Sequence, residues 1–304
     1  MTRTAAVFSV LIGLVLAVAG CSVDMNGDRP TVVVTTNILG DITQNIVGDA
    51  AEVRVLMPRN ADPHSFEVSA AESARIASAD LVISNGLGLE EGIAKTVDAA
   101  RSEDVPVLEV APAVNPIAFD AGAGAGTPDP HFWTDPDRVA DAVGLIRDAV
   151  VEHVDGVEAS VIDERAQRYG GRISELTSTM TARFQSIPEP QRILITNHHV
   201  FGYLAQRFDF DVIGAVVPSG TTLASPSSAD LADLSTAVRN SGVRAIFVDS
   251  SQPSKLAEAL AKESGTDVEV VALFTESLGE DGSGAATYLE MMTSNTNRIT
   301  KALQ

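Results

Sequence analysis

Short β-branched runs alternate along the first half of the chain with stretches whose apolar residues recur every three or four positions. A compact apolar run predicts a buried strand, and the longer period predicts a helix. The expected strands are residues 31–36, 53–57, 81–84 and 107–110. The expected helices are residues 37–47, 69–79 and 90–100. This alternation predicts a parallel sheet covered by helices on its faces.

The same alternation returns in the second half, after two helical stretches at residues 136–151 and 158–187. The second stretch ends at Pro188 and Pro190, because proline cannot continue a helix. Strands are then expected at residues 192–196, 212–217, 245–248 and 269–273, and helices at 200–208, 228–240, 253–264 and 287–303. The predicted fold class is therefore α/β, with two parallel-sheet lobes bridged by one long helix.

The chain is expected to divide into five segments. They are a signal peptide at 1–20, a tether at 21–30, a first lobe at 31–152, a linking helix at 153–189 and a second lobe at 190–304.

The first twenty residues form a separate segment. A short positive start that includes Arg3 precedes an apolar run at residues 5–19. This run is shorter than the roughly 20 residues that a spanning helix needs, so it is typical of a secretory signal peptide. Small residues precede Cys21, the only cysteine of the chain, in a pattern similar to a bacterial lipoprotein signal. We expect Cys21 to be lipidated and to anchor the protein to the extracytoplasmic face of the cell membrane; the alternative is an uncleaved helix with a buried thiol.

Composition and charge narrow the function classes. The chain is 45% hydrophobic and 20% charged, which is typical of a globular protein. It carries 21 Lys and Arg against 41 Asp and Glu, a net charge of −20. A surface of this sign argues against nucleic-acid binding and attracts cations, although solubility alone also explains it.

Histidines are few and share a context. Of the five, His64, His131 and the adjacent pair His198 and His199 stand where a strand leads into a helix. Ligand sites of open α/β sheets form beyond the carboxyl ends of the strands. One of the adjacent pair is expected to be a bystander, because neighbouring residues at a helix start point in different directions. His153 lies within a helical stretch and is expected to face solvent.

Two of these histidines end an Asp-Pro-His tripeptide. Asp62 and Asp129 each stand two residues before a histidine, a position from which a carboxylate can orient a ligating imidazole. Three imidazoles at strand ends predict a transition-metal site. We expect metal binding to weaken below about pH 6, where imidazoles protonate.

Several motifs in order resemble those of the ZnuA/TroA-like family, the metal-binding receptors of bacterial ABC importers for zinc and manganese. The matching stretches are MP at 57–58, DPHSFE at 62–67, NGLGLE at 85–90, DPHFW at 129–133, HHVFGYL at 198–204, SPS at 225–227 and FTESLG at 274–279. The resemblance covers residues 31–304. It implies a cluster A-I solute-binding fold, two lobes with the metal between them and a long bridging helix.

The resemblance also implies the ligands. They are His64 and His131 from the first lobe, and His198 and Glu276 from the second. The family motif places its ligand three residues before the aromatic, which selects His198 over His199. Glu276 stands where the family more often has Asp. The implied partners are an ABC permease with its ATPase, the metal ion, the membrane through the lipid anchor and a metallochaperone, with no nucleic acid; the protein is expected to be a monomer.

Zinc is the metal that this donor set favours, because three imidazoles and one carboxylate suit tetrahedral Zn²⁺ better than Mn²⁺. Manganese remains the alternative, since the segment at 120–129 lacks the histidines that many zinc members carry there. A zinc hydrolase with Glu276 as its base is a further alternative. The chain has no H-E-x-x-H or G-x-S-x-G motif, so we expect a binding protein and not an enzyme. An adhesin has no support beyond surface exposure.

Overall fold

The computed structural model describes residues 29–304 except 121 and 123. The expected signal peptide at 1–20, the lipidation site Cys21 and most of the tether at 21–30 therefore lie outside the described residues. Within residues 29–304, with those two gaps, no helix combines the length and the apolar character that crossing a membrane requires.

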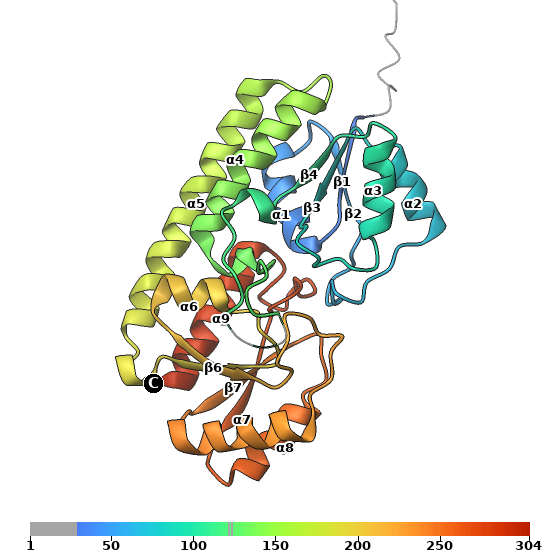
Figure 1. Ribbon diagram of the computed structural model, residues 1–304. Coiled ribbons are helices and arrows are strands. Elements are labelled where there is room, and N and C mark those ends of the chain that lie inside the picture. The colour runs from blue at the N-terminus through green and yellow to red at the C-terminus, as the bar shows by residue number, and fades with distance from the viewer. Residues whose placement is uncertain (1–28, 121, 123) are drawn as a thin grey trace, which may run out of the picture.

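The first lobe contains a four-stranded parallel sheet in the order β2-β1-β3-β4 (Figure 1). Its strands are β1 (Thr31–Val34), β2 (Glu52–Val55), β3 (Leu81–Ser84) and β4 (Val107–Glu109), and its helices are α1 (Asn37–Val47), α2 (Ala70–Ala77) and α3 (Ala94–Ser102). Successive side chains of β1 point to opposite faces. Val32 and Val34 pack towards α1, whereas Val33 packs with Ile76 of α2 and Val97 of α3. Both faces of the sheet are thus covered.

The second lobe repeats this strand order as β6-β5-β7-β8. Its strands are β5 (Ile193–Thr196), β6 (Asp211–Ala215), β7 (Ala245–Asp249) and β8 (Glu269–Leu273), and its helices are α6 (Gly202–Phe208), α7 (Ser228–Ser241), α8 (Lys255–Ser264) and α9 (Tyr288–Leu303). Ile195 and Ile246 pack with Leu234 of α7 and Leu260 of α8. The predicted α/β fold of two parallel-sheet lobes is confirmed.

One long helix connects the lobes. Helix α4 (Pro136–His153) precedes α5 (Ala159–Gln185), whose 27 residues span about 40 Å. The buried face of α5 runs from Ile162 to Phe184 and lies in one continuous apolar core with α1, α4 and α9. The helix therefore packs against both lobes at once (Figure 1). Short 3₁₀ turns lie at η1 (Ala111–Ala113), η2 (Phe132–Thr134) and η3 (Glu189–Gln191).

The expected elements agree with the structure to within a few residues, with one informative difference. Ser69 and Glu72 form the predicted capping box at the start of α2. The helix expected at 90–100 begins only at Ala94. Glu90 is buried, and its carboxylate accepts hydrogen bonds from the Thr35 hydroxyl at 2.6 Å and the Asn85 N–H at 2.8 Å. It therefore closes the turn after β3 and does not open the helix.

Candidate metal centre

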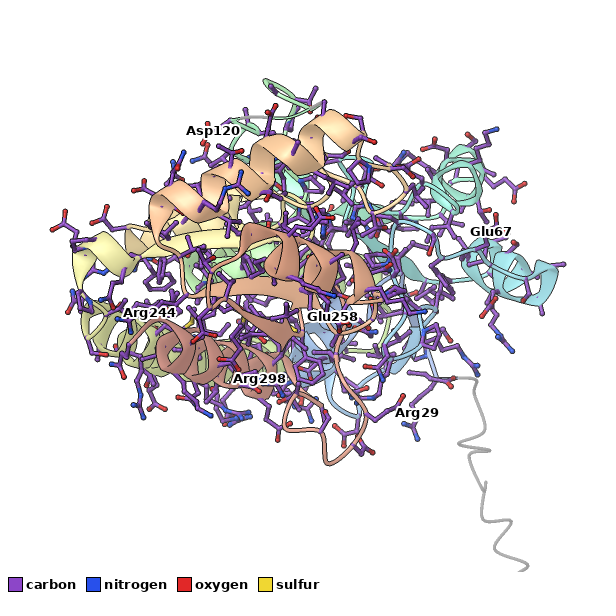
Figure 2. The ribbon with its side chains drawn as sticks, turned by 90° about the horizontal axis from the view of Figure 1, so that it is seen from below. Arg29, Glu67, Asp120, Arg244, Glu258 and Arg298 are labelled. Atoms are coloured by element: carbon purple, nitrogen blue, oxygen red, sulfur yellow. The ribbon has the colours of Figure 1, made fainter. Side chains whose placement is uncertain are left out.

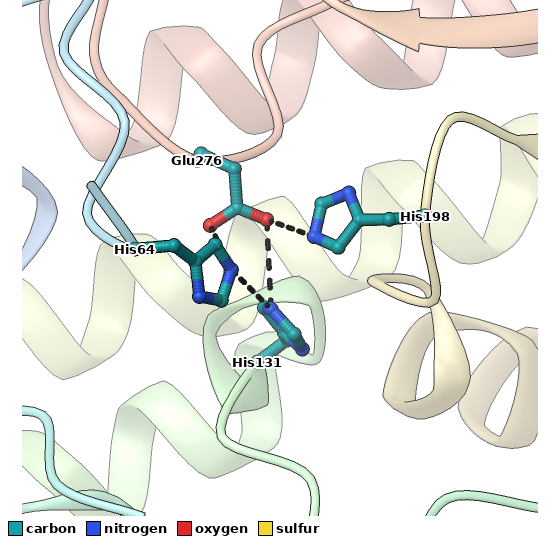
Figure 3. Close-up of side chains that lie close together, drawn as sticks. All are labelled: His64, His131, His198 and Glu276. Atoms are coloured by element: carbon teal, nitrogen blue, oxygen red, sulfur yellow. Dashed lines mark hydrogen bonds and ion pairs between the residues drawn. The ribbon is translucent and has the colours of Figure 1, made fainter. Parts of the chain in front are cut away.

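Four side chains from distant parts of the chain meet between the two lobes: His64, His131, His198 and Glu276 (Figure 3). His64 lies in the loop after β2, and His131 immediately precedes η2. His198 follows β5 by two residues, and Glu276 follows β8 by three. The cluster thus forms beyond the carboxyl ends of the parallel strands, where open α/β sheets place their ligands.

The donor atoms are close enough to share one ion. One ligand atom from each side chain lies within 4.8 Å of the other three. His131 Nε2 is 3.5 Å from His64 Nε2 and 3.6 Å from Glu276 Oε1, and Glu276 Oε2 is 4.0 Å from His64 Nε2. Zinc bonds of about 2.0–2.2 Å in a tetrahedron separate the ligands by about 3.3–3.6 Å. The two separations from His131 Nε2 lie in this range, whereas 4.0 Å between His64 Nε2 and Glu276 Oε2 is longer and 2.9 Å between His198 Nε2 and Glu276 Oε1 is shorter.

Several polar atoms of these four buried side chains have no hydrogen-bond partner. The four side chains expose at most 2% of their surface. Nδ1 and Nε2 of His198, Nδ1 of His64 and both oxygens of Glu276 make no hydrogen bond of acceptable geometry within the described part of the chain. Buried polar atoms in folded proteins are nearly always satisfied. Of these, His198 Nε2 and the two Glu276 oxygens lie at the cluster itself, and unsatisfied nitrogen and oxygen atoms that face one point indicate a site for a cation.

Burial also sets the charge of the cluster. It lowers the pKa of His64 to about 2, with the neighbouring His131 and His198 adding to the effect. It lowers the pKa of His198 to about 4 and raises the pKa of Glu276 to about 8. At neutral pH the imidazoles of His64 and His198 are therefore uncharged, and the Glu276 carboxyl holds a proton that a metal ion would displace.

Asp129 orients the imidazole of His131. Its Oδ1 accepts the Nδ1–H of His131 at 2.7 Å and the backbone N–H of the same residue at 2.9 Å. This bond fixes the tautomer, so that Nε2 presents its lone pair to the cluster. Asp62 of the other Asp-Pro-His tripeptide accepts the backbone N–H of His64 at 3.0 Å but makes no hydrogen bond to its ring. Asp129 therefore orients the ring of a histidine, whereas Asp62 holds the backbone of the His64 loop.

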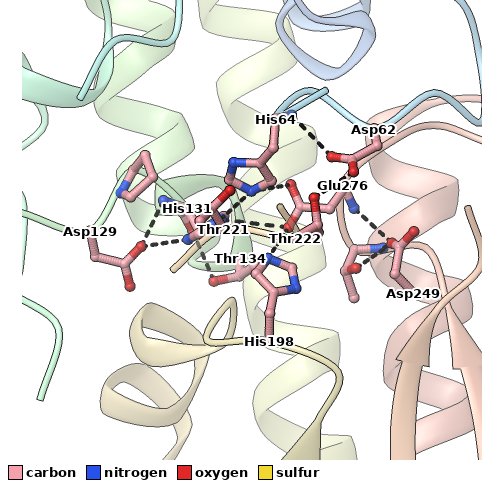
Figure 4. A network of polar contacts seen from close by, with 12 residues as sticks. Asp62, His64, Asp129, His131, Thr134, His198, Thr221, Thr222, Asp249 and Glu276 are labelled. Carbon is pink, nitrogen blue, oxygen red and sulfur yellow. Dashed lines mark hydrogen bonds and ion pairs between the residues drawn. The ribbon is translucent and has the colours of Figure 1, made fainter. Parts of the chain in front are cut away.

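A buried carboxylate that the sequence did not indicate holds the Glu276 segment. Asp249, at the end of β7, accepts the backbone N–H of Thr275 at 3.0 Å and that of Glu276 at 3.1 Å, and also the Thr275 hydroxyl (Figure 4). From the other lobe, the Trp133 indole N–H donates to the Thr275 carbonyl at 2.8 Å. In the sequence, Asp249 is distinguished only as an acidic residue at the end of an otherwise apolar strand.

The remaining candidates lie outside the cluster. His199 is half-buried, and its backbone N–H bonds the Ser219 carbonyl at 2.9 Å. His153 is the exposed last residue of α4. Glu67 is exposed on the surface of the first lobe (Figure 2). The structure thus brings together the four side chains expected as ligands and keeps the other two histidines apart from them.

One family model and several relatives match most of the chain. The family described as zinc-uptake complex component A, periplasmic (ZnuA), matches residues 32–302. The manganese-binding lipoprotein MntA of Halalkalibacterium halodurans is 28% identical over 300 residues, which cover 97% of each chain. The zinc-binding protein TroA of Treponema pallidum is 29% identical over 282 residues, 90% of this chain and 89% of the relative.

Solved structures show the same fold. The periplasmic zinc-binding protein TroA of Treponema pallidum superposes with a TM-score of 0.84 at 27% identity, over 90% of this chain and 99% of that one. The manganese-bound periplasmic metal-binding protein of Candidatus Liberibacter asiaticus gives a TM-score of 0.80 at 25% identity, over 91% and 100% of the two chains.

Proposed function

This chain belongs to the family of periplasmic zinc-uptake complex component A, and from that premise we propose that it is an extracytoplasmic receptor that captures Zn²⁺ for an ABC importer. The observation that carries the proposal is the buried cluster of His64, His131, His198 and Glu276, whose donor atoms lie within 4.8 Å of one another. These four side chains would be the ligands. The receptor would hand the ion to a membrane permease driven by its ATPase.

The donor chemistry supports zinc as the cargo. Three imidazoles and one carboxylate make a closed, nitrogen-rich set, which suits a structural or transported Zn²⁺. Glu276 takes the place of the more usual aspartate, and its longer side chain still brings Oε1 within 3.6 Å of His131 Nε2. All four donors can therefore contribute one atom each to a tetrahedron.

Manganese is the second candidate, and one feature favours it. Both Glu276 oxygens face the cluster, since Oε2 lies 4.0 Å from His64 Nε2 and Oε1 lies nearer the other two histidines. A carboxylate that binds through both oxygens supplies the oxygen-richer coordination that Mn²⁺ prefers. The relatives include proteins named for each metal.

The receptor is not an enzyme, as the members of its family are substrate-binding components of importers. Four buried ligands would also fill a tetrahedral site and leave no open position for hydrolysis. All four side chains are buried, and each directs an atom at the same point. A catalytic zinc keeps one position for water and substrate.

The proposed location is the outer face of the cell membrane. Cys21 would carry the lipid after removal of residues 1–20, and residues 21–30 would form the tether. Several relatives are named lipoproteins, among them that of Halalkalibacterium halodurans. The proposed lobes are residues 31–152 and 190–304, with the linking helix at 153–189.

Metal analysis tests the proposed cargo. The mature protein, purified without chelator, is assayed for bound metals and then titrated with Zn²⁺ and Mn²⁺ in competition with a chromophoric chelator. We expect one zinc per chain and at least a tenfold preference for zinc, as the higher affinity of nitrogen-rich sites for zinc implies. A preference for manganese would select the second candidate, and binding of neither ion would overturn the proposal.

A further inference from the structure

A hollow of about 400 Å³ opens beside the cluster and reaches His64. Its walls come from both lobes. They include Glu91, Phe119 and Pro130 of the first lobe and Ser219, Gly220 and Thr221 of the second. Of the four cluster residues only His64 lines this hollow, and His64 itself is 2% exposed.

The wall on the second lobe is a loop without helix or strand, residues 217–223. Its Gly220 lies so close to Phe119 that a Cβ there would collide with the aromatic ring. Phe119 in turn packs edge-on to His131, with 6.1 Å between the ring centroids. The 217–223 loop therefore packs against Phe119 of the opposite lobe, which in turn contacts a residue of the cluster.

One hydrogen bond ties this loop to the first lobe within the described residues. The Thr222 hydroxyl donates to Asp62 Oδ2 at 2.5 Å (Figure 4). Gln252, which follows β7 in the second lobe, donates its side-chain N–H to the same oxygen at 2.9 Å. The other oxygen, Asp62 Oδ1, accepts the backbone N–H of His64 at 3.0 Å. A single carboxylate thus joins the loop, the second lobe and the backbone of His64.

The other segments around the cluster are held across the lobes more firmly. Trp133 bonds the Thr275 carbonyl, and the Asn37 side chain bonds both the Ser277 hydroxyl at 2.7 Å and the Leu278 N–H at 2.8 Å. Helix α6 is tied through Tyr203, whose hydroxyl donates to the Asp129 carbonyl at 2.6 Å. The Tyr203 hydroxyl also accepts the Ile117 N–H at 3.3 Å. Among the described residues, the 217–223 loop therefore has fewer hydrogen bonds across the lobes than these segments have.

We propose that the 217–223 loop is the gate through which the metal ion enters and leaves, and that Asp62 is a positioning residue that latches this gate through Thr222 and Gln252. The inference rests on the proposed metal-binding function. When the two hydrogen bonds to Asp62 Oδ2 break, the loop withdraws from Phe119 and the hollow beside His64 widens. The ion then exchanges while the segments of His131 and Glu276 stay in place.

The test measures the rate of zinc exchange. Zinc-loaded protein is mixed with excess chromophoric chelator, and the release rate is recorded at chelator concentrations high enough that it no longer depends on them. Thr222→Val and Gln252→Met each remove one donor to a carboxylate at nearly constant volume. We expect each to release zinc about tenfold faster, as the loss of one charge-assisted hydrogen bond implies.

Conservative and distant controls separate a latch from a general loss of stability. Thr222→Ser keeps the donor hydroxyl, and Thr236→Val makes the same chemical change on the exposed face of α7. Both should release zinc within about twofold of the unmodified protein. Capture should also become faster in the two latch variants, so that the affinity changes less than the release rate. Loss of a ligand would accelerate release alone.

The results distinguish a failure of the proposed latch from a failure of the proposed zinc-binding function. If the unmodified protein binds no zinc, the proposed function fails. If it binds zinc but Thr222→Val and Gln252→Met both release it within about twofold of the unmodified rate, the latch is wrong. Faster release in Thr222→Ser as well would assign the effect to packing of the loop and would also overturn the latch.

Discussion

The indole N–H of Trp133 donates a hydrogen bond to the Thr275 carbonyl at 2.8 Å, which joins the segment after His131 to the residue before Glu276. Two ligand segments from opposite lobes thus share one buried contact. Asp249 holds the same backbone from the other side. Asp249 and Trp133 therefore fix the backbone of Glu276 through hydrogen bonds that do not involve its carboxylate.

Trp133→Phe tests this contact. The change keeps an aromatic ring but leaves the buried Thr275 carbonyl without its donor, which costs about 1–3 kcal/mol. We expect a lower midpoint in urea and about tenfold weaker zinc binding, because the Glu276 segment loses an anchor. The free energy of unfolding and the zinc affinity are measured on the same preparation. An unchanged affinity would show that Asp249 alone positions Glu276.

Loss of a single imidazole tests the ligand set. His64→Ala, His131→Ala and His198→Ala should each weaken zinc binding more than about 100-fold, since even residues that only orient ligands cost 10–100-fold. His153→Ala and His199→Ala provide matched controls, because they remove imidazoles that lie outside the cluster. Chelator competition measures all five. Near-normal affinity in His131→Ala would contradict the assignment.

Asp129→Asn tests the orientation of His131. The amide nitrogen or oxygen of asparagine can still face Nδ1, but the charge that favours the Nδ1–H tautomer is gone. We expect zinc affinity to fall about 10–100-fold with little change in stability at neutral pH. Asp135→Asn, which alters an acid near the start of α4, serves as the comparison. Equal losses in both variants would mean that Asp129 has no special role.

Zinc binding should release a proton at neutral pH. Burial raises the pKa of Glu276 to about 8, so the free carboxyl is protonated at pH 7 and must ionise to bind the ion. The apparent affinity should therefore rise about tenfold per pH unit up to about pH 8. Calorimetric titration in buffers of different ionisation enthalpy counts the proton.

This pH dependence differs from the sequence-based expectation of weakening only below about pH 6. The reason is burial, which lowers the pKa of His64 to about 2 and that of His198 to about 4 and moves the titration to the carboxyl. Glu276→Gln should abolish proton release. Release of a proton by that variant would assign the proton to another group.

The metal-free protein should be most stable in mildly acidic solution. The pKa of Glu276 is about 8 in the folded state and 4.5 for a glutamate exposed to water, so the folded state holds more protons between these values and loses stability as pH rises through them. The pKa of His64 falls from 6.5 to about 2, so stability is also lost as pH falls through that range.

Thermal unfolding at a series of pH values checks this. Because the pKa of His198 is also lowered, to about 4, the two histidines outweigh Glu276 below about pH 6.5, so the melting temperature of the metal-free form should peak at about pH 6.5. Zinc should remove the decline on the alkaline side. Glu276→Gln, which cannot ionise, should flatten the same side without zinc. A metal-free melting temperature that rises steadily from pH 5 to pH 8 would contradict these pKa shifts.

The fold was predictable because its signals are local. The β-branched run that contains Val32 to Val34 and the four-residue spacing of Ile38, Ile42 and Ile46 specify β1 and α1 without reference to the rest of the chain. Glu90 shows the limit of such signals. A glutamate is favourable at the start of a helix, but the Glu90 carboxylate instead accepts a hydrogen bond from the backbone N–H of Asn85. This donor lies close to Glu90 only in the folded turn.

The site was predictable only as a set of residue types. Histidines at strand ends could be read from the sequence, whereas the role of Asp249 depends on hydrogen bonds to residues 26 and 27 positions away. The pKa of Glu276 likewise follows from burial between the lobes, which no local pattern encodes. The metal preference of the cluster depends on such details as well as on the donor types.

The way in which Glu276 is supported has an evolutionary consequence. Asp249 and Trp133 hold the backbone at residues 275–276 and do not touch the acidic side chain. A single codon change at position 276 can therefore shorten the donor by one methylene while the backbone contacts of both lobes stay intact. The metal donor at this position can thus vary between related proteins without any change in the residues that support it.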